Sequence, residues 1–359
     1  MGVVLYDHNR LIHVVFDLQN RREKMNEQEI LLNASTDTQY TGTVLSDPSE
    51  LGNTDDNKKI ITKTAIVFVI AGLLYQGSQL LFSFIFNRFF PEVTEKLGSN
   101  LWMIMMLVTD LLILVPVFFL LCKNIPTVKS KPSKLGAGTF AAALFISYFF
   151  IVVGAFAGSQ ISSLFMENNT NLLTEVIGGG STLLRLVSVG IVGPICEELV
   201  FRKLLIDRFS RFGNTFAVIV SGLMFGLFHV NLQQFFYAFA LGVIFGYIYV
   251  KTRNIVYSSI LHMIINSYTS VLVLWGLSGY GTDLVKTAVY NLSLVLEVVM
   301  ALVGCVLYII SVSKKKIKIT ENAVEPGNTS YMFQNWALWL FYIAMIGLTV
   351  FVTIKTAAM

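Results

Sequence analysis

Nine long runs of apolar residues restrict the possible folds of this chain more than any other feature. The runs cover residues 64–86, 101–121, 137–157, 182–205, 215–230, 235–250, 255–275, 287–311 and 335–354. About 20 apolar residues form an α-helix that crosses the hydrocarbon core of a bilayer. With 55% hydrophobic and 13% charged residues, the chain is too apolar for an ordinary soluble domain. We therefore expect an all-α, polytopic integral membrane bundle of about nine transmembrane helices, within a range of 8 to 10.

The basic residues alternate between the connections that join these runs. Fifteen Lys and Arg residues lie just before the first run or in the second, fourth, sixth and eighth connections. The odd-numbered connections and the C-terminus hold only Arg88, Lys96, Lys286 and Lys355. Because cytoplasmic loops carry an excess of Lys and Arg, this pattern predicts a cytoplasmic N-terminus and an outer C-terminus.

The runs also suggest how the chain is organised. We expect a flexible cytoplasmic tail at 1–60, a transmembrane core at 61–312, a basic cytoplasmic connection at 313–334 and an extra C-terminal transmembrane helix at 335–359. The outer connection at 158–181 is either a plain connector, which we favour, or a lid. The basic residues form no single patch, so we expect no nucleic-acid partner. Membrane lipids and a membrane-associated protein or peptide are the expected partners.

Charged residues interrupt the fourth run, where each of them carries a cost in free energy. Residues 193–202 read Gly-Pro-Ile-Cys-Glu-Glu-Leu-Val-Phe-Arg, and a charge at the centre of a membrane helix costs about 2.5–3.5 kcal/mol on insertion scales. Glu198 and Arg202 are four residues apart, so they share a helix face and can pair. Glu197 points about a quarter-turn away and is the candidate general base for activating water. A purely structural ion network is the alternative.

A second polar pair lies on the seventh run. His262 and Asn266 are also four residues apart and share one helix face. A histidine can orient or polarise water, and an amide can donate a hydrogen bond to the oxyanion that forms when a peptide carbonyl is attacked. A buried structural histidine is the commoner case. However, both histidines of the apolar runs, His229 and His262, lie within 70 residues of the glutamate pair, which favours a site.

Three motifs follow one another on these apolar runs. They are Glu197-Glu198-x-x-x-Arg202, Phe225-x-x-x-His229 and His262-x-x-x-Asn266. Together they resemble the signature of the CPBP family (CAAX protease and bacteriocin-processing, also called Abi), which includes the type II CAAX prenyl proteases. The match covers roughly residues 180–275. The resemblance implies an intramembrane protease core in which Glu197 acts as the base, assisted by His229, His262 and Asn266. It also implies a cavity open to the membrane and to the cytoplasmic side.

The spacing of these residues is compatible with a site that needs a metal ion and with one that does not. Two histidines and a glutamate can hold a catalytic zinc ion with one position free, and Glu197, His229 and His262 would be the candidate ligands. The sequence contains no His-Glu-x-x-His motif, and the three ligands would come from three separate helices. We favour a mechanism without an obligatory metal.

The candidate site residues are expected to lie at different depths in the membrane. Counted from the cytoplasmic ends of straight helices, Glu197 and His262 lie about 10–12 Å deep, whereas His229 lies about 21 Å deep. Tilting of the short fifth helix would reduce the gap; otherwise His229 is structural.

The leading hypothesis is an intramembrane endopeptidase, with Glu198 and Arg202 holding the helix geometry. A non-catalytic membrane scaffold or regulator of the same family is the alternative. A transporter is a third hypothesis, supported by the isolated acids Asp110 and Glu297.

Overall fold

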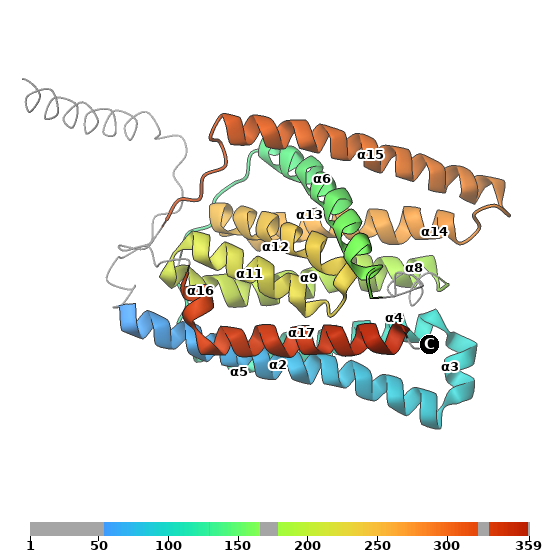
Figure 1. Ribbon diagram of the computed structural model, residues 1–359, viewed down its shortest axis with the longest axis horizontal. Coiled ribbons are helices and arrows are strands. Elements are labelled where there is room, and N and C mark those ends of the chain that lie inside the picture. Colours follow the sequence, from blue (N-terminus) through green and yellow to red (C-terminus); the bar gives the residue numbers. More distant parts are fainter. Residues whose placement is uncertain (1–53, 129, 166–178, 322–329, 358–359) are drawn as a thin grey trace, which may run out of the picture. The chain divides into compact units, whose positions relative to one another are not determined.

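The computed structural model describes residues 54–128, 130–165, 179–321 and 330–357 of the chain. Within these ranges every regular element is a helix (Figure 1). The all-α fold class predicted from the sequence is therefore confirmed. Most of the predicted tail, and the centre of the outer connection considered as a lid, lie outside the described residues.

Seven helical stretches of the described part are long and apolar enough to cross a membrane, by length and composition. They are α2 (Thr54–Phe89), α4 (Ser99–Thr109) continued by η2 (Asp110–Leu114) and α5 (Val115–Cys122), α6 (Ala137–Ser162), α12 (Leu232–Thr252), α13 (Ile255–Ser267) continued by η6 (Tyr268–Val273) and α14 (Leu274–Leu277), α15 (Leu284–Ser313) and α17 (Trp336–Ala357). The fifth predicted run forms a shorter apolar helix, α11 (Asn214–Phe228). The chain is thus a polytopic helical membrane protein.

The fourth predicted run is helical throughout but changes its hydrogen-bond pattern. It comprises α8 (Thr182–Arg185), η3 (Leu186–Val192), α9 (Gly193–Glu198), η4 (Leu199–Ile206) and α10 (Asp207–Phe209). Both η3 and η4 are π-helices. This form is rare in proteins, and where it occurs it is often at a functional site. Pro194 lies where η3 gives way to α9, and proline cannot donate a hydrogen bond to the preceding turn.

Helices α11 and α12 form an antiparallel pair at the centre of the bundle (Figure 1). The turn between them is tight because Val230 adopts a left-handed conformation with φ of 50°. The Asn231 side chain then accepts hydrogen bonds from the backbone N–H groups of Gln233 and Gln234 and caps α12. Helices α6 and α15 pack on one side of this pair, and α2 and α17 lie side by side on the other (Figure 1).

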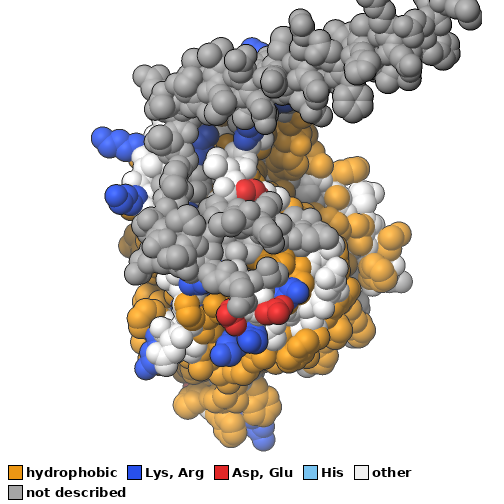
Figure 2. Space-filling view, turned by 90° about the vertical axis from the view of Figure 1, so that its left-hand side faces the viewer, with side chains coloured by type: hydrophobic (Ala, Val, Ile, Leu, Met, Phe, Trp, Pro, Cys, Tyr) orange, Lys and Arg blue, Asp and Glu red, His pale blue; other side chains and the backbone are white. Residues whose placement is uncertain are grey.

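A polar network joins one end of α10, α11 and α12. Asp207 accepts a hydrogen bond from Tyr249 at 2.7 Å, and the Arg253 guanidinium donates to the Asn214 side chain at 2.6 Å. Glu321 caps α11 by accepting from the backbone N–H of Asn214 at 2.6 Å. Figure 2 shows this end of the molecule, with basic and acidic side chains bordered by hydrophobic flanks. The network therefore aligns the helices on which the candidate site depends.

Small residues let two outer helices approach closely. A Cβ atom on Gly304 of α15 would clash with the carbonyl oxygen of Phe145 on α6, whereas one on Gly347 of α17 would meet nothing within 4 Å. We expect Gly304→Ala to lower the free energy of unfolding by about 1–3 kcal/mol because the backbones must move apart. Gly347→Ala is the matched control. Thermal unfolding in detergent measures both, and equal stability of the two variants would contradict this packing.

Candidate active site

A buried ion pair anchors the candidate site. Glu198 Oε2 accepts from Arg202 Nε at 3.0 Å, and both side chains are 0% exposed. The pair predicted from the four-residue spacing is therefore present. Arg202 Nη1 also donates to Ser221 Oγ of α11 at 2.9 Å, and Ser221 donates to the Phe201 carbonyl oxygen. These bonds fix Glu198 and tie η4 to α11.

Two aromatic rings hold the guanidinium and an imidazole together. The Arg202 guanidinium lies 4.9 Å from the Phe225 ring centroid and 5.7 Å from that of Phe245. The same rings lie 5.8 Å and 4.9 Å from the His262 ring. Cation–π attraction in such a water-poor setting contributes about 2 kcal/mol. Phe225 and Phe245 thus position both Arg202 and His262.

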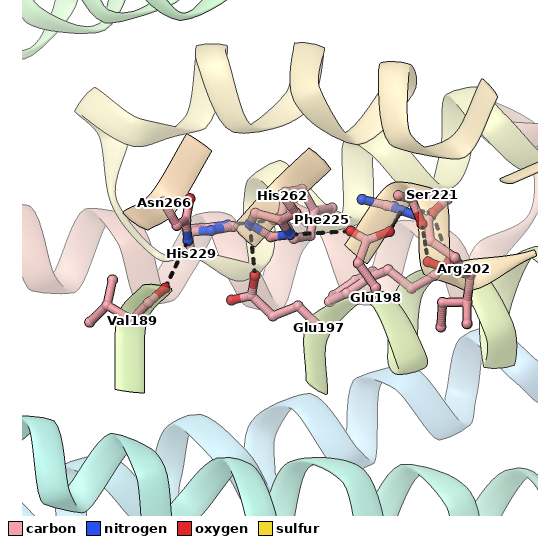
Figure 3. Close-up of polar contacts among 12 residues, drawn as sticks. Val189, Glu197, Glu198, Arg202, Ser221, Phe225, His229, His262 and Asn266 are labelled. Carbon is pink, nitrogen blue, oxygen red and sulfur yellow. Dashed lines mark hydrogen bonds and ion pairs between the residues drawn. The ribbon is translucent and has the colours of Figure 1, made fainter. Parts of the chain in front are cut away.

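The His262 imidazole links the two glutamates (Figure 3). Its Nδ1 lies 3.3 Å from Glu198 Oε1, and its Nε2 lies 3.6 Å from Glu197 Oε2. His262 is buried, with 3% exposure, whereas the Glu197 side chain is 24% exposed. The ring therefore connects a buried carboxylate, neutralised by Arg202, to a more accessible one.

His229 reaches the site despite its greater depth along α11. Its imidazole folds back toward the helix N-terminus, as helical side chains do, and Nδ1 lies 2.8 Å from the Phe225 carbonyl oxygen. The Phe225 ring contacts both imidazoles, with centroid distances of 4.7 Å to His229 and 5.8 Å to His262. Since a carbonyl can only accept, Nδ1 carries the proton and Nε2 offers a lone pair. The depth mismatch expected from straight helices therefore does not separate His229 from the other residues.

Asn266 is tied to the π-helical break. Its Nδ2 donates to the Val189 carbonyl oxygen at 3.2 Å (Figure 3), and Ser267 Oγ donates to the Gly190 carbonyl oxygen at 3.3 Å. The next helical donors do not serve the Val189 carbonyl, because the Gly193 N–H reaches Ser188 instead and Pro194 has no N–H. Asn266 thus locks α13 against η3, and its second Nδ2 hydrogen is left for another acceptor.

The six residues divide by exposure. Glu198, Arg202 and His262 are buried, whereas Glu197, His229 and Asn266 are partly exposed. The three buried residues can fix the positions of the others, and the three partly exposed residues can contact a bound molecule.

A zinc site does not fit the described side chains. Among them, no group of three or more His, Cys, Asp or Glu residues is arranged to hold a metal ion. Both ring nitrogens of His262 already face carboxylates. We therefore assign no step to a metal.

Sequence reasoning missed several residues that shape this site. They are Val189, Ser221, Phe245, Tyr75 and Gln76. For Val189 the sequence does hold a signal, because Pro194, which has no N–H, lies five residues further on. The other four are ordinary residues of membrane helices, and their roles depend on long-range packing.

The fold and this cluster define a helical membrane protein with a polar, partly accessible site between helices. A comparison with known protein families finds a match to this part of the chain. Residues 179–268 match the model "Type II CAAX prenyl endopeptidase Rce1-like". The resemblance drawn from the sequence is therefore confirmed over these residues, which are similar to an Rce1-like domain of the CAAX protease family.

Two curated proteins show the same similarity. The chain is 28% identical over 115 residues to the "Putative membrane peptidase YdiL" of Bacillus subtilis (strain 168), covering 32% of this chain and 46% of YdiL. It is 36% identical over 90 residues to the "Membrane-embedded CAAX protease MroQ" of Staphylococcus aureus (strain USA300), covering 23% of this chain and 36% of MroQ. The matched region spans less than half of each relative. No solved structure matches the chain.

Proposed function

We propose that this protein is an intramembrane endopeptidase that hydrolyses a peptide bond in a membrane-associated protein or peptide. The observation that carries the proposal is the contact of Glu197 with His262, at 3.6 Å, inside a helical membrane bundle. The Rce1-like match of residues 179–268 supports the same reaction class. The names of the relatives, a membrane peptidase and a CAAX protease, agree with it.

In the proposed mechanism, the partly exposed residues act on water and the peptide. Glu197 takes a proton from water while the free Nε2 of His229 orients that water, and the oxygen attacks the peptide carbonyl. The remaining Nδ2 hydrogen of Asn266 donates to the oxyanion. The proton on Glu197 then passes to the leaving nitrogen, so the C–N bond breaks and the carboxylate is restored.

The buried residues act indirectly in this proposal. Arg202 neutralises Glu198, Glu198 holds the His262 ring, and His262 orients the Glu197 carboxylate. His262 is too buried to touch a peptide, so its role is positioning. Prenylated C-termini and other membrane-anchored peptides are the two substrate classes that this proposal allows. The alternation of basic connections supports a cytoplasmic N-terminus.

A non-catalytic scaffold is the second candidate. The observation that favours it is the buried network of Glu198, Arg202 and Ser221, which ties helices together without needing a substrate.

A comparison of membrane proteomes separates the two candidates. Cells that produce the wild-type chain, the Glu197→Gln variant or no chain are compared for new C-terminal peptides of membrane proteins. An endopeptidase yields fragments in the wild type that are lost equally in the other two samples. A scaffold yields the same fragments with wild type and variant, and that result would remove the proposed function.

A further inference from the structure

A buried acid and phenol lie beside the candidate site and have no part in the mechanism above. Asp110, the first residue of η2, is 4% exposed, and its Oδ1 accepts a hydrogen bond from the Tyr75 hydroxyl of α2 at 2.7 Å. Intramembrane acids are costly and are normally paired or functional. Tyr75 is a neutral partner, and no described Lys, Arg or His forms an ion pair with Asp110. The carboxyl group therefore has no counterion among the described residues.

Asp110 faces the same side of α9 as Glu197. A Cβ atom on Gly193 would lie 3.7 Å from Asp110 Oδ2. Gly193 precedes Glu197 by four residues, so the two positions share a helix face. Tyr75, Asp110 and Glu197 are also close enough to interact electrostatically. The site thus contains a second carboxyl group that the three sequence motifs do not include.

Helix α2 fixes this pair and the end of α11 together. The Tyr75 ring stacks on Phe228, with centroids 5.4 Å apart and planes at 15°. Gln76 Nε2 donates to the Phe228 carbonyl oxygen at 2.7 Å. Since Phe228 directly precedes His229, the same helix turn holds both Asp110 and the histidine end of the site.

We propose that Asp110, held by Tyr75, is a positioning residue whose negative charge makes Glu197 a stronger base. The inference deepens the proposed function and rests on it. When Glu197 takes a proton from water, the repulsion between the two carboxylates is relieved, so the transfer becomes more favourable. The hydrogen bond from Tyr75 stabilises the charged form of Asp110. Because Asp110 then stays ionised, the proton from water goes to Glu197.

Other groups also act on the two carboxyl groups. Glu197 contacts His262 of α13, and the charges of Glu198 on its own helix and of Arg202 on η4 act on it electrostatically. Asp110 is hydrogen-bonded to Tyr75 of α2 and interacts electrostatically with Cys196 of α9. The positive charge of Arg202 opposes the effect of Asp110 on Glu197, but its own carboxylate partner, Glu198, offsets that charge. With the charges of Arg202 and Glu198 offsetting each other, the negative charge of Asp110 is the one that acts on Glu197.

An infrared titration tests this coupling without requiring turnover. The full chain in lipid nanodiscs is titrated with pH, and the protonated carboxyl band lost in Glu197→Gln is assigned to Glu197. In Asp110→Asn this band should disappear at a pH lower by at least about one unit, a tenfold weaker proton affinity. Tyr75→Phe, which keeps the carboxyl group, should shift it less in the same direction. Glu297→Gln, an acid of α15, is the control and should leave it unchanged.

Hydrolysis supplies the second readout. We expect Asp110→Asn to lower kcat about tenfold, with KM unchanged and the acid limb of the pH profile moved to lower pH. An unchanged Glu197 band in both Asp110→Asn and Tyr75→Phe would overturn the inference, even if Glu197 proves essential. If the Glu197 band shifts in Asp110→Asn but the wild-type chain hydrolyses no peptide, the coupling is upheld and the proposed function is rejected.

Discussion

Replacing Glu197 by glutamine is expected to lower the rate of peptide hydrolysis by about 10²–10⁴-fold, the usual contribution of a general base. The amide keeps the size of the side chain but cannot take a proton from water. Because the effect falls on the chemical step, kcat should drop while KM changes little. The measurement is the turnover of synthetic membrane-anchored peptides by purified protein in nanodiscs.

The matched control is Glu95→Gln. Glu95 is an exposed glutamate of α3 (Pro91–Leu97), outside the candidate site, and its variant should keep the wild-type rate. Thermal unfolding of both variants checks that any loss is not a loss of folding. Full activity in folded Glu197→Gln would exclude Glu197 as the base.

Replacing Arg202 by methionine is expected to have the largest effect on stability. The change leaves the Glu198 carboxylate fully buried without its partner, since both side chains are 0% exposed. Removing one member of a buried ion pair costs about 3–5 kcal/mol. The Ser221 hydroxyl also loses its bond to Nη1. Thermal unfolding in detergent should therefore show a large drop in the midpoint.

A double variant separates lost charge pairing from lost packing. Arg202→Met combined with Glu198→Gln removes both charges and should recover a large part of the stability, because replacing a complete buried pair is often close to neutral. Its activity should stay low, since residue 198 no longer holds His262 as a carboxylate does. Arg88→Met removes an exposed arginine and should change little. Equal stability of Arg202→Met and Arg88→Met would contradict the role of the pair.

The sequence predicted the fold class and the local pairs of the site well. Long apolar runs determine membrane helices because the bilayer demands that backbone hydrogen bonds be satisfied within each segment. The Glu198–Arg202 pair and the shared face of His262 and Asn266 follow from a spacing of four residues. Each of these predictions needs only the geometry of a single helix.

The rest depends on how helices cross and where they bend. The depth estimate for His229 assumed straight helices and ignored the fold of its ring back toward Phe225. The bond between Asn266 and Val189 depends on a carbonyl freed by a π-helix. The pairing of Asp110 with Tyr75 joins residues on two different helices, so Asp110 looked like an isolated acid.

An experimental structure of the protein in lipid nanodiscs tests the central claim most directly. The quantity to measure is the distance between Glu197 Oε2 and His262 Nε2, which lies at 3.6 Å in the structure described above. A similar distance, with Glu197 turned toward His229 and Asn266, is the expected result. A Glu197 side chain that faces the acyl chains, or lies more than about 12 Å from both His262 and Asn266, would contradict the account.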